Sequence, residues 1–150
     1  MNYDVILLDD VREWLYKAGI DANACRAMFA SGFSNLEVPI GNHLQQTIEK
    51  FLKAFLVLHN AQLKKTHDLD ELAELCIMVN PLLYNILNNI GELTPFSTIY
   101  RYPISERLDI SFSELVIYTK ITEQVIKSML PLFPSEVNSD LEILTDPILN

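Results

Sequence analysis

The chain has 150 residues, 49% of them apolar, and its formal net charge is −9 at pH 7. This length suits one domain, and this apolar share is enough to bury a core. The negative charge argues against broad adhesion to a phosphate backbone, because such binding needs a positive surface. The first ten residues do not resemble a signal peptide and no apolar run is long enough to span a bilayer, which together indicate a cytoplasmic protein.

The first predicted helix begins at Asp9 or Asp10, whose carboxylates suit a helix start. Apolar residues then recur at helical spacing from Val11 to Phe29, and the helix ends near Gly32. Cys25 lies on its apolar side, as does Cys76 on a later helix. Nothing in the chain resembles a secreted disulfide framework, so both are expected to be buried free thiols.

A loop through Pro39 and Gly41 leads into a second predicted helix, which ends near Asn60. One side carries an apolar stripe of Leu44, Ile48, Phe51, Leu52, Phe55 and Leu56. The other side carries Gln45, Gln46, Glu49, Lys50 and Lys53. Because apolar stripes face a core, this polar row is expected to be open to partners.

Asp68 is a favourable N-cap for a third helix, because Glu71 follows three residues later in a capping-box arrangement. Pro81 is tolerated at the first position of a fourth helix, which is expected to extend to about Leu93. Ser111 and Glu114 repeat the capping-box pattern before the last long helix.

Between these last two helices, residues 95–110 are expected to form an ordered loop that contains Tyr100, Arg101 and Tyr102. Beyond the last helix, residues 134–150 hold four acidic residues and no basic residue. They are expected to be either loosely ordered or packed as a short segment. The predicted fold is all-α, an up-and-down bundle of four long helices plus a short fifth helix.

The chain lacks the sequence motifs of several common catalytic and metal-binding sites. The chain contains no Glu-x-x-His pair, no Gly-rich phosphate loop, no His-Glu-x-x-His, no Cys-x-x-Cys and no Gly-x-Ser-x-Gly. The sequence therefore predicts no metal site and no cofactor, and it argues against a conventional enzyme.

Positive charge is concentrated locally. Of the eleven Lys and Arg residues, Lys50, Lys53, Lys64 and Lys65 fall between positions 50 and 65. A single anionic ligand could bind there. Lys50, Lys53 and His67 could supply donors to a phosphate, and Arg101 with its flanking tyrosines could stack on a base.

Each of these residues also has a plainer explanation. Glu49 and Lys53 are spaced as a favourable solvated helix pair. For Gln45 and Gln46, hydrogen bonds between helices or across a dimer are the favoured role, and His67 suits the turn before the third helix. A pairing of Arg101 with Glu49 would tie the loop to the bundle without any ligand.

Four segments occur in the same order as in the HEPN (higher eukaryotes and prokaryotes nucleotide-binding) domain family. In chain order they are Trp14-Leu15-Tyr16-Lys17-Ala18 with Asp21, the polar row of the second helix, Lys65-Thr66-His67-Asp68-Leu69, and Arg101-Tyr102-Pro103. The chain resembles this family over residues 9–133. The resemblance implies a HEPN-like helical bundle, which we place over residues 1–133, and the composition of residues 134–150 marks them as an acidic C-terminal tail.

The resemblance also implies a homodimer, nucleotide binding in some members, and a small nucleotidyltransferase as partner in a toxin–antitoxin-like pair. Many relatives cleave RNA with an Arg followed, after four to six residues, by a His near the start of the last helix. This chain departs from that pattern, since no His follows His67.

Three functions follow as hypotheses. The first is a HEPN-like protein that binds a nucleotide or a nucleotidyltransferase without the ribonuclease motif, through Gln46, Glu49, Lys50, Lys53, His67, Arg101 and Tyr102. The second is a metal-independent ribonuclease whose base has moved to His67 or His43. The third is a helical dimerisation module held by complementary charges.

Overall fold

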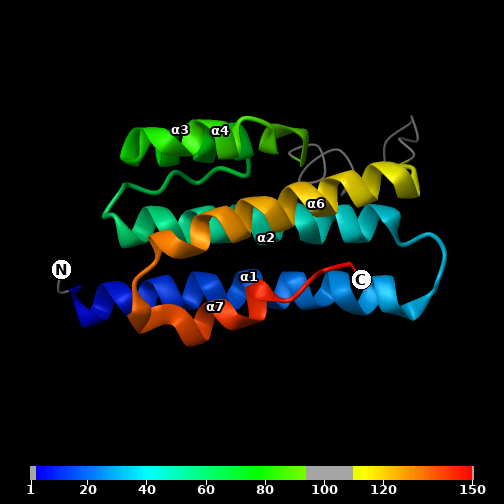
Figure 1. The fold of residues 1–150 in the computed structure, drawn as a ribbon, viewed down its shortest axis with the longest axis horizontal. Coiled ribbons are helices and arrows are strands. Elements are labelled where there is room, and N and C mark those ends of the chain that lie inside the picture. Colours follow the sequence, from blue (N-terminus) through cyan, green and yellow to red (C-terminus); the bar gives the residue numbers. More distant parts are fainter. Residues whose placement is uncertain (1–2, 94–109, 150) are drawn as a thin grey trace.

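The computed structural model describes residues 3–93 and 110–149, and every regular element in these two ranges is a helix or a helical turn (Figure 1). The predicted all-α class is therefore confirmed. Within these ranges, no helix combines the length and apolar character that crossing a membrane requires.

Helix α1 (Val5–Ser31) begins four or five residues earlier than predicted. Asp4 is its N-cap, and the Asp4 side chain accepts a hydrogen bond of 3.0 Å from the backbone N–H of Ile6. The helix ends where predicted, at Gly32, whose φ of 69° is a left-handed conformation that suits glycine.

Helix α2 (Glu37–Leu58) includes Pro39 and Gly41, so the prediction of a loop through these two residues was wrong. Pro39 is the third helical residue. Its missing N–H falls in the first turn, where backbone donors have no partner inside the helix. The sequence pattern therefore indicated the helix correctly but placed its start too late.

Helix α3 (Leu69–Val79) has the predicted N-cap, because the Asp68 side chain accepts a hydrogen bond of 2.9 Å from the N–H of Asp70. The predicted continuous helix over residues 81–93 is wrong. It is divided into the 3-10 turn Pro81–Leu83, the single-turn helix α4 (Tyr84–Leu87) and the 3-10 turn Ile90–Leu93. Asn88, Asn89 and Gly91 are poor helix formers, which accounts for the break.

Helix α6 (Phe112–Met129) begins at the predicted capping box, with a hydrogen bond of 3.1 Å from the N–H of Glu114 to Ser111 Oγ. Two 3-10 turns, Leu130–Leu132 and Ser135–Val137, lead to helix α7 (Asn138–Thr145), which packs on α1. The tail thus forms a packed segment. The division of the chain at residue 133 remains a prediction.

Helix α2 lies between α1 and the layer of α3 and α4, and α6 crosses it (Figure 1). The start of α3 lies beside Gln45, and further along Cys76 Sγ lies 4.0 Å from the carbonyl of Leu52. Helices α2 and α3 therefore run in the same direction, unlike strict up-and-down neighbours. The reason is that residues 59–68 return along α2 before α3 begins.

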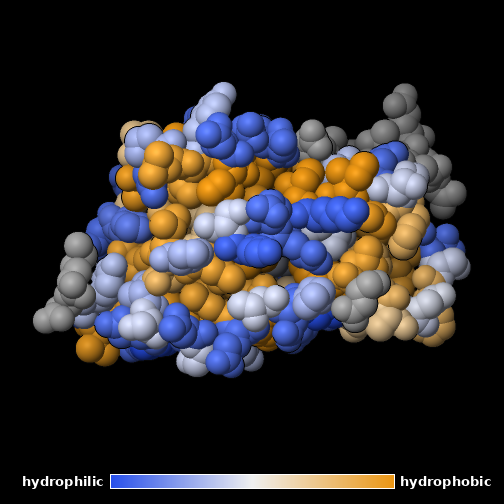
Figure 2. Space-filling view, in the orientation of Figure 1, coloured by the Kyte–Doolittle hydropathy of each residue, from blue (hydrophilic) through white to orange (hydrophobic). Residues whose placement is uncertain are grey.

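The core follows α2, which is packed on several sides. Its largest fully buried side chains are Phe51, Phe55, Leu44, Ile48, Leu52 and Leu56. Burial of each such side chain contributes roughly 1.5–3 kcal/mol to folding. Figure 2 shows one face, on which polar side chains follow α6 and the α3–α4 layer while apolar side chains fill the space between them.

Candidate functional site

Glu49 on α2 is the centre of a buried polar cluster and only 5% exposed. Its Oε1 accepts a hydrogen bond of 2.8 Å from Lys53 Nζ, one turn later on the same helix. Its Oε2 accepts a hydrogen bond of 2.9 Å from Gln45 Nε2, and His67 Nδ1 lies 3.0 Å from Oε1. Three residues that the sequence predicted for one site, Glu49, Lys53 and His67, therefore meet.

The cluster sets the ionisation of Glu49. Burial on its own raises the pKa of this carboxyl group, because it disfavours the charged form. Hydrogen bonds from Lys53 and Gln45, together with the charges of Lys53 and His67, outweigh burial and hold the pKa below its ordinary value. Glu49 is therefore a carboxylate at neutral pH.

His67 connects this buried cluster to solvent. It lies on the segment that returns along α2, and its backbone carbonyl accepts a hydrogen bond of 3.2 Å from Gln45 Nε2. Its side chain is 62% exposed. Because Nδ1 faces Glu49, Nε2 is the ring nitrogen left for an external ligand.

A second carboxylate and histidine pair lies between α1 and α2. Asp21 on α1 is buried, and its Oδ1 lies 2.8 Å from His43 Nδ1. Its other oxygen accepts a hydrogen bond from Lys50 Nζ. Sequence reasoning missed Asp21 as a site residue, although Trp14 and Asp21 are seven residues apart and so share one face of α1.

Trp14 supplies an aromatic plane that sequence reasoning also missed. Lys53 Nζ lies 5.3 Å from the centroid of the Trp14 ring, and Lys17 Nζ lies 5.6 Å from it. Cations at this distance from an aromatic face are attracted by its quadrupole. We define the polar seam as Trp14, Lys17 and Asp21 on α1, His43, Gln46, Glu49, Lys50 and Lys53 on α2, and His67.

The prediction that the polar row of α2 is open to partners was wrong for three of its members. Gln45, Glu49 and Lys53 are all buried, whereas Gln46 and Lys50 are partly exposed. The reason is that α1 and the returning segment cover this side of α2. Lys50 and Lys53 are also each paired with a buried carboxylate.

Arg101 and Tyr102 lie outside the described residues. The expected ordered loop, its stacking role and the pairing of Arg101 with Glu49 therefore stay predictions. In the described ranges Glu49 is paired with Lys53 and His67.

Cys25 and Cys76 are buried free thiols, as predicted. Burial raises the pKa of each thiol to about 12. Neither is therefore a nucleophile at neutral pH. Among the residues that the structure describes, no group of three or more His, Cys, Asp and Glu side chains is arranged to hold a metal ion.

Comparison with protein-family models matches most of the chain. Residues 11–131 match the family model of the HEPN domain. This range begins within α1, ends within the 3-10 turn that follows α6, and lies inside the residues over which the sequence resembled the family. No curated protein and no solved structure matches the chain.

Proposed function

The chain belongs to the HEPN domain family, and on that premise we propose that it binds a nucleotide or a short RNA through His67, without the Arg/His motif of the family's ribonucleases. The observation that carries the proposal is the geometry of His67. A buried carboxylate holds one ring nitrogen, while most of the side chain stays exposed. Because the side chain of His67 is already held in place, it loses little conformational entropy when it contacts a phosphate.

Local charge supports an anionic ligand at this position. Lys64 and Lys65 are exposed and precede His67 by three and two residues. Lys50 and Lys53 are already neutralised by Asp21 and Glu49. In the proposal they therefore hold the residues of the polar seam in place and are not free cations for the ligand. Glu49 likewise acts through His67, as a positioning residue.

The remaining predicted residues, together with Trp14, have supporting roles in the proposal. Gln46 is partly exposed and lies one turn from both His43 and Lys50, so its amide can contact a ribose or base edge. Trp14 offers a stacking plane in the seam. Arg101 and Tyr102 lie outside the described residues, and in the proposal they contact the base.

Calorimetry with ATP, GTP and a short RNA tests the proposal. We expect heat of binding with at least one of them, and at least tenfold weaker binding after His67→Ala. His59→Ala is the matched control, because His59 is an exposed histidine with no carboxylate partner among its described contacts. No heat with any ligand, or equal binding by both variants, would contradict it.

A ribonuclease is the second candidate, and one observation favours it. Both histidines suggested as a relocated base, His67 and His43, have Nδ1 held by a buried carboxylate, which is how a general base is oriented. Labelled RNA incubated with the unchanged chain and with His67→Ala and His43→Ala separates the two candidates. Cleavage that survives both substitutions would exclude these residues as the base.

The proposed setting is a homodimer that works beside a small nucleotidyltransferase, as in toxin–antitoxin pairs. Sedimentation at low and high salt tests the dimer, and co-purification with the nucleotidyltransferase tests the partner. Dimerisation that weakens with salt, without binding of any nucleotide, would instead support a purely structural dimerisation module.

A further inference from the structure

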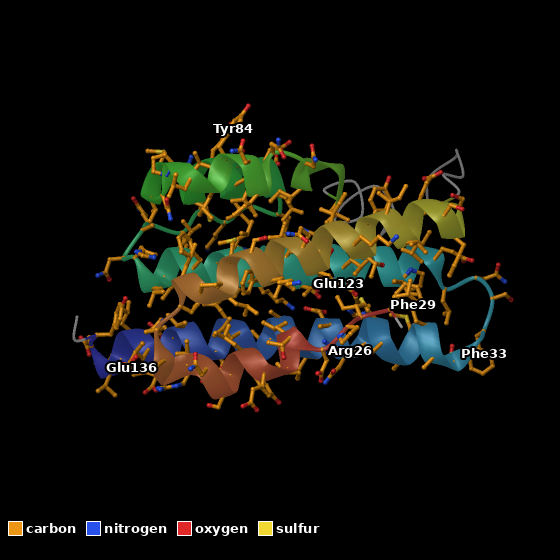
Figure 3. The ribbon with its side chains drawn as sticks, in the orientation of Figure 1. Arg26, Phe29, Phe33, Tyr84, Glu123 and Glu136 are labelled. Carbon is orange, nitrogen blue, oxygen red and sulfur yellow. The ribbon has the colours of Figure 1, made fainter. Side chains whose placement is uncertain are left out.

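Three strongly exposed apolar side chains lie where the chain passes from α3 into α4. Met78 near the end of α3 is 79% exposed, Leu82 in the following 3-10 turn is 82% exposed, and Tyr84 at the start of α4 is 62% exposed. Figure 3 shows Tyr84 pointing away from the body of the molecule. Single exposed apolar residues are ordinary on protein surfaces, whereas a group of them indicates an interaction surface.

A hollow of about 570 Å³ lies beside Met78. Leu75, Met78 and Val79 of α3 line one side of it, and Leu63 and Lys64 line the other, on the segment that returns along α2. Apart from Lys64, these five residues are apolar. The hollow is open space, so an apolar side chain of a partner can enter it without displacing another part of the described chain.

The exposed face of α3 that leads to Met78 is acidic. Glu71, Glu74 and Met78 follow one another at intervals of three and four residues, so they share one face of the helix. All three are exposed, and α3 contains no basic residue. In the described ranges neither Glu71 nor Glu74 has an ion-pair partner. This face therefore presents two unpaired carboxylates beside the exposed apolar group.

The charge of this face distinguishes between two kinds of occupant. In a dimer with a two-fold axis, the same surface of both copies meets. Glu71 and Glu74 of one copy would then lie near the same carboxylates of the other, and like charges at an interface are unfavourable. The net charge of −9 adds to the repulsion between copies. A positively charged partner is attracted by both features.

We propose that the α3–α4 corner docks an amphipathic basic helix of a partner protein. The corner comprises Glu71, Glu74, Met78, Leu82 and Tyr84. The hollow receives an apolar side chain of the partner helix, Leu82 and Tyr84 extend the apolar contact, and the two carboxylates pair with its basic residues. Lys64, across the hollow, disfavours placing the basic side of the helix there. The inference does not depend on the ligand proposed at His67, because it uses no residue of the polar seam.

The probe is a fluorescein-labelled amphipathic peptide made of leucine and lysine, with leucine at helical spacing. Its counterpart has glutamate in place of every lysine. Fluorescence anisotropy measures the binding of each peptide to the full chain. We expect the leucine–lysine peptide to bind at least tenfold more tightly than its counterpart.

The apolar contact is tested with Met78→Ser combined with Leu82→Ser. Both side chains are exposed, so the double variant should fold, and circular dichroism checks this. We expect it to bind the leucine–lysine peptide at least tenfold more weakly than the unchanged chain. Ile6→Ser is the matched control, because Ile6 is also strongly exposed but lies on α1. It should leave binding unchanged.

The charge contact is tested with Glu71→Lys combined with Glu74→Lys. This variant should prefer the leucine–glutamate peptide, because the carboxylates are replaced by ammonium groups. Glu136→Lys combined with Glu142→Lys is the matched control, since it changes the net charge equally at two exposed positions on the C-terminal segment. The control should keep the preference for the leucine–lysine peptide.

Equal behaviour of the two charge-reversal variants would overturn the proposal, because the peptide would then be attracted by the acidic surface as a whole. The proposal also fails if the leucine–lysine peptide does not bind the unchanged chain, or if the Met78 and Leu82 variant binds it equally well. A dimer that this variant loses in sedimentation would overturn it as well, because the occupant is then a second copy.

Discussion

Glu49 and Lys53 form an ion pair that is almost fully buried, and the two residues depend on each other. Removing one member of a buried pair leaves the other charge without compensation, which costs roughly 3–5 kcal/mol. We therefore expect Glu49→Ala to lower the free energy of unfolding by about that amount in urea titrations. Glu13→Ala removes an exposed pair with Lys17 and should cost under about 1 kcal/mol. Equal losses would contradict this account.

The lowered pKa of Glu49 also predicts a pH dependence. The unfolded carboxyl group titrates near 4.5, whereas the folded one titrates below that value. Between the two pKa values the unfolded state binds more protons, so stability falls as the pH falls. We expect the stability difference between the unchanged chain and Glu49→Gln to be constant well above pH 4.5 and to shrink below it. Urea titrations across acidic pH measure this difference, and one that grows on acidification would show the opposite shift.

The cysteines provide a test of native packing. Because burial raises the pKa of Cys25 and Cys76 to about 12, their reactive thiolate form is suppressed in the folded protein. We expect a thiol reagent such as DTNB to label both residues rapidly in denaturant and only slowly in native buffer. Rapid labelling in native buffer would show that one helix opens easily.

At the scale of helices, Gly19 controls the docking of α7. A Cβ atom at this position would lie 2.7 Å from Cγ2 of Ile143, which is too close for any real contact. We expect Gly19→Ala to destabilise the chain by about 1–3 kcal/mol through overpacking. In the Ile143→Ala background the same change should stabilise it by up to about 1 kcal/mol, because alanine is the better helix former. Thermal unfolding of the four chains measures the change of sign, and no such change would remove the role assigned to Ile143.

Helix ends were predictable where a short local motif defines them. Asp68 before α3 and Ser111 before α6 cap their helices as the sequence indicated. The region 81–93 failed for a different reason. Leu83, Leu87 and Ile90 follow one another at helical intervals of four and three residues, and all three are buried, but two 3-10 turns and a single helical turn place them there. The spacing of apolar residues therefore indicates which side chains are buried, but it does not determine the path of the backbone.

At the scale of the whole molecule, burial of polar residues could not be predicted from one helix. The spacing on α2 placed Glu49 and Lys53 opposite the apolar stripe, which normally means exposure to solvent. Burial follows from the returning segment with His67 and from Trp14 on α1, both of which cover that side. These contacts join residues 18 or more positions apart in the sequence. The periodicity of α2 alone therefore cannot predict them.

The overall charge limits what the proposed nucleotide site can bind. The net charge is −9, and the exposed cations closest in sequence to His67 are Lys64 and Lys65. Neutralising two or three phosphates of a single strand predicts that the logarithm of the binding constant falls with the logarithm of salt concentration with a slope between about −1.4 and −2.1. We therefore expect RNAs of different lengths, once they span this region, to bind with similar affinity per site.

Filter binding of a short and a long RNA of the same repeated sequence, at several salt concentrations, measures both quantities. Charge reversal of the two exposed lysines, Lys64→Glu with Lys65→Glu, should flatten the salt dependence for both RNAs, because the remaining surface repels phosphate. A much steeper slope for the long RNA would mean that it contacts additional cations elsewhere. The acidic surface would then not confine binding to one site, since phosphates beyond His67 would find further positive charge.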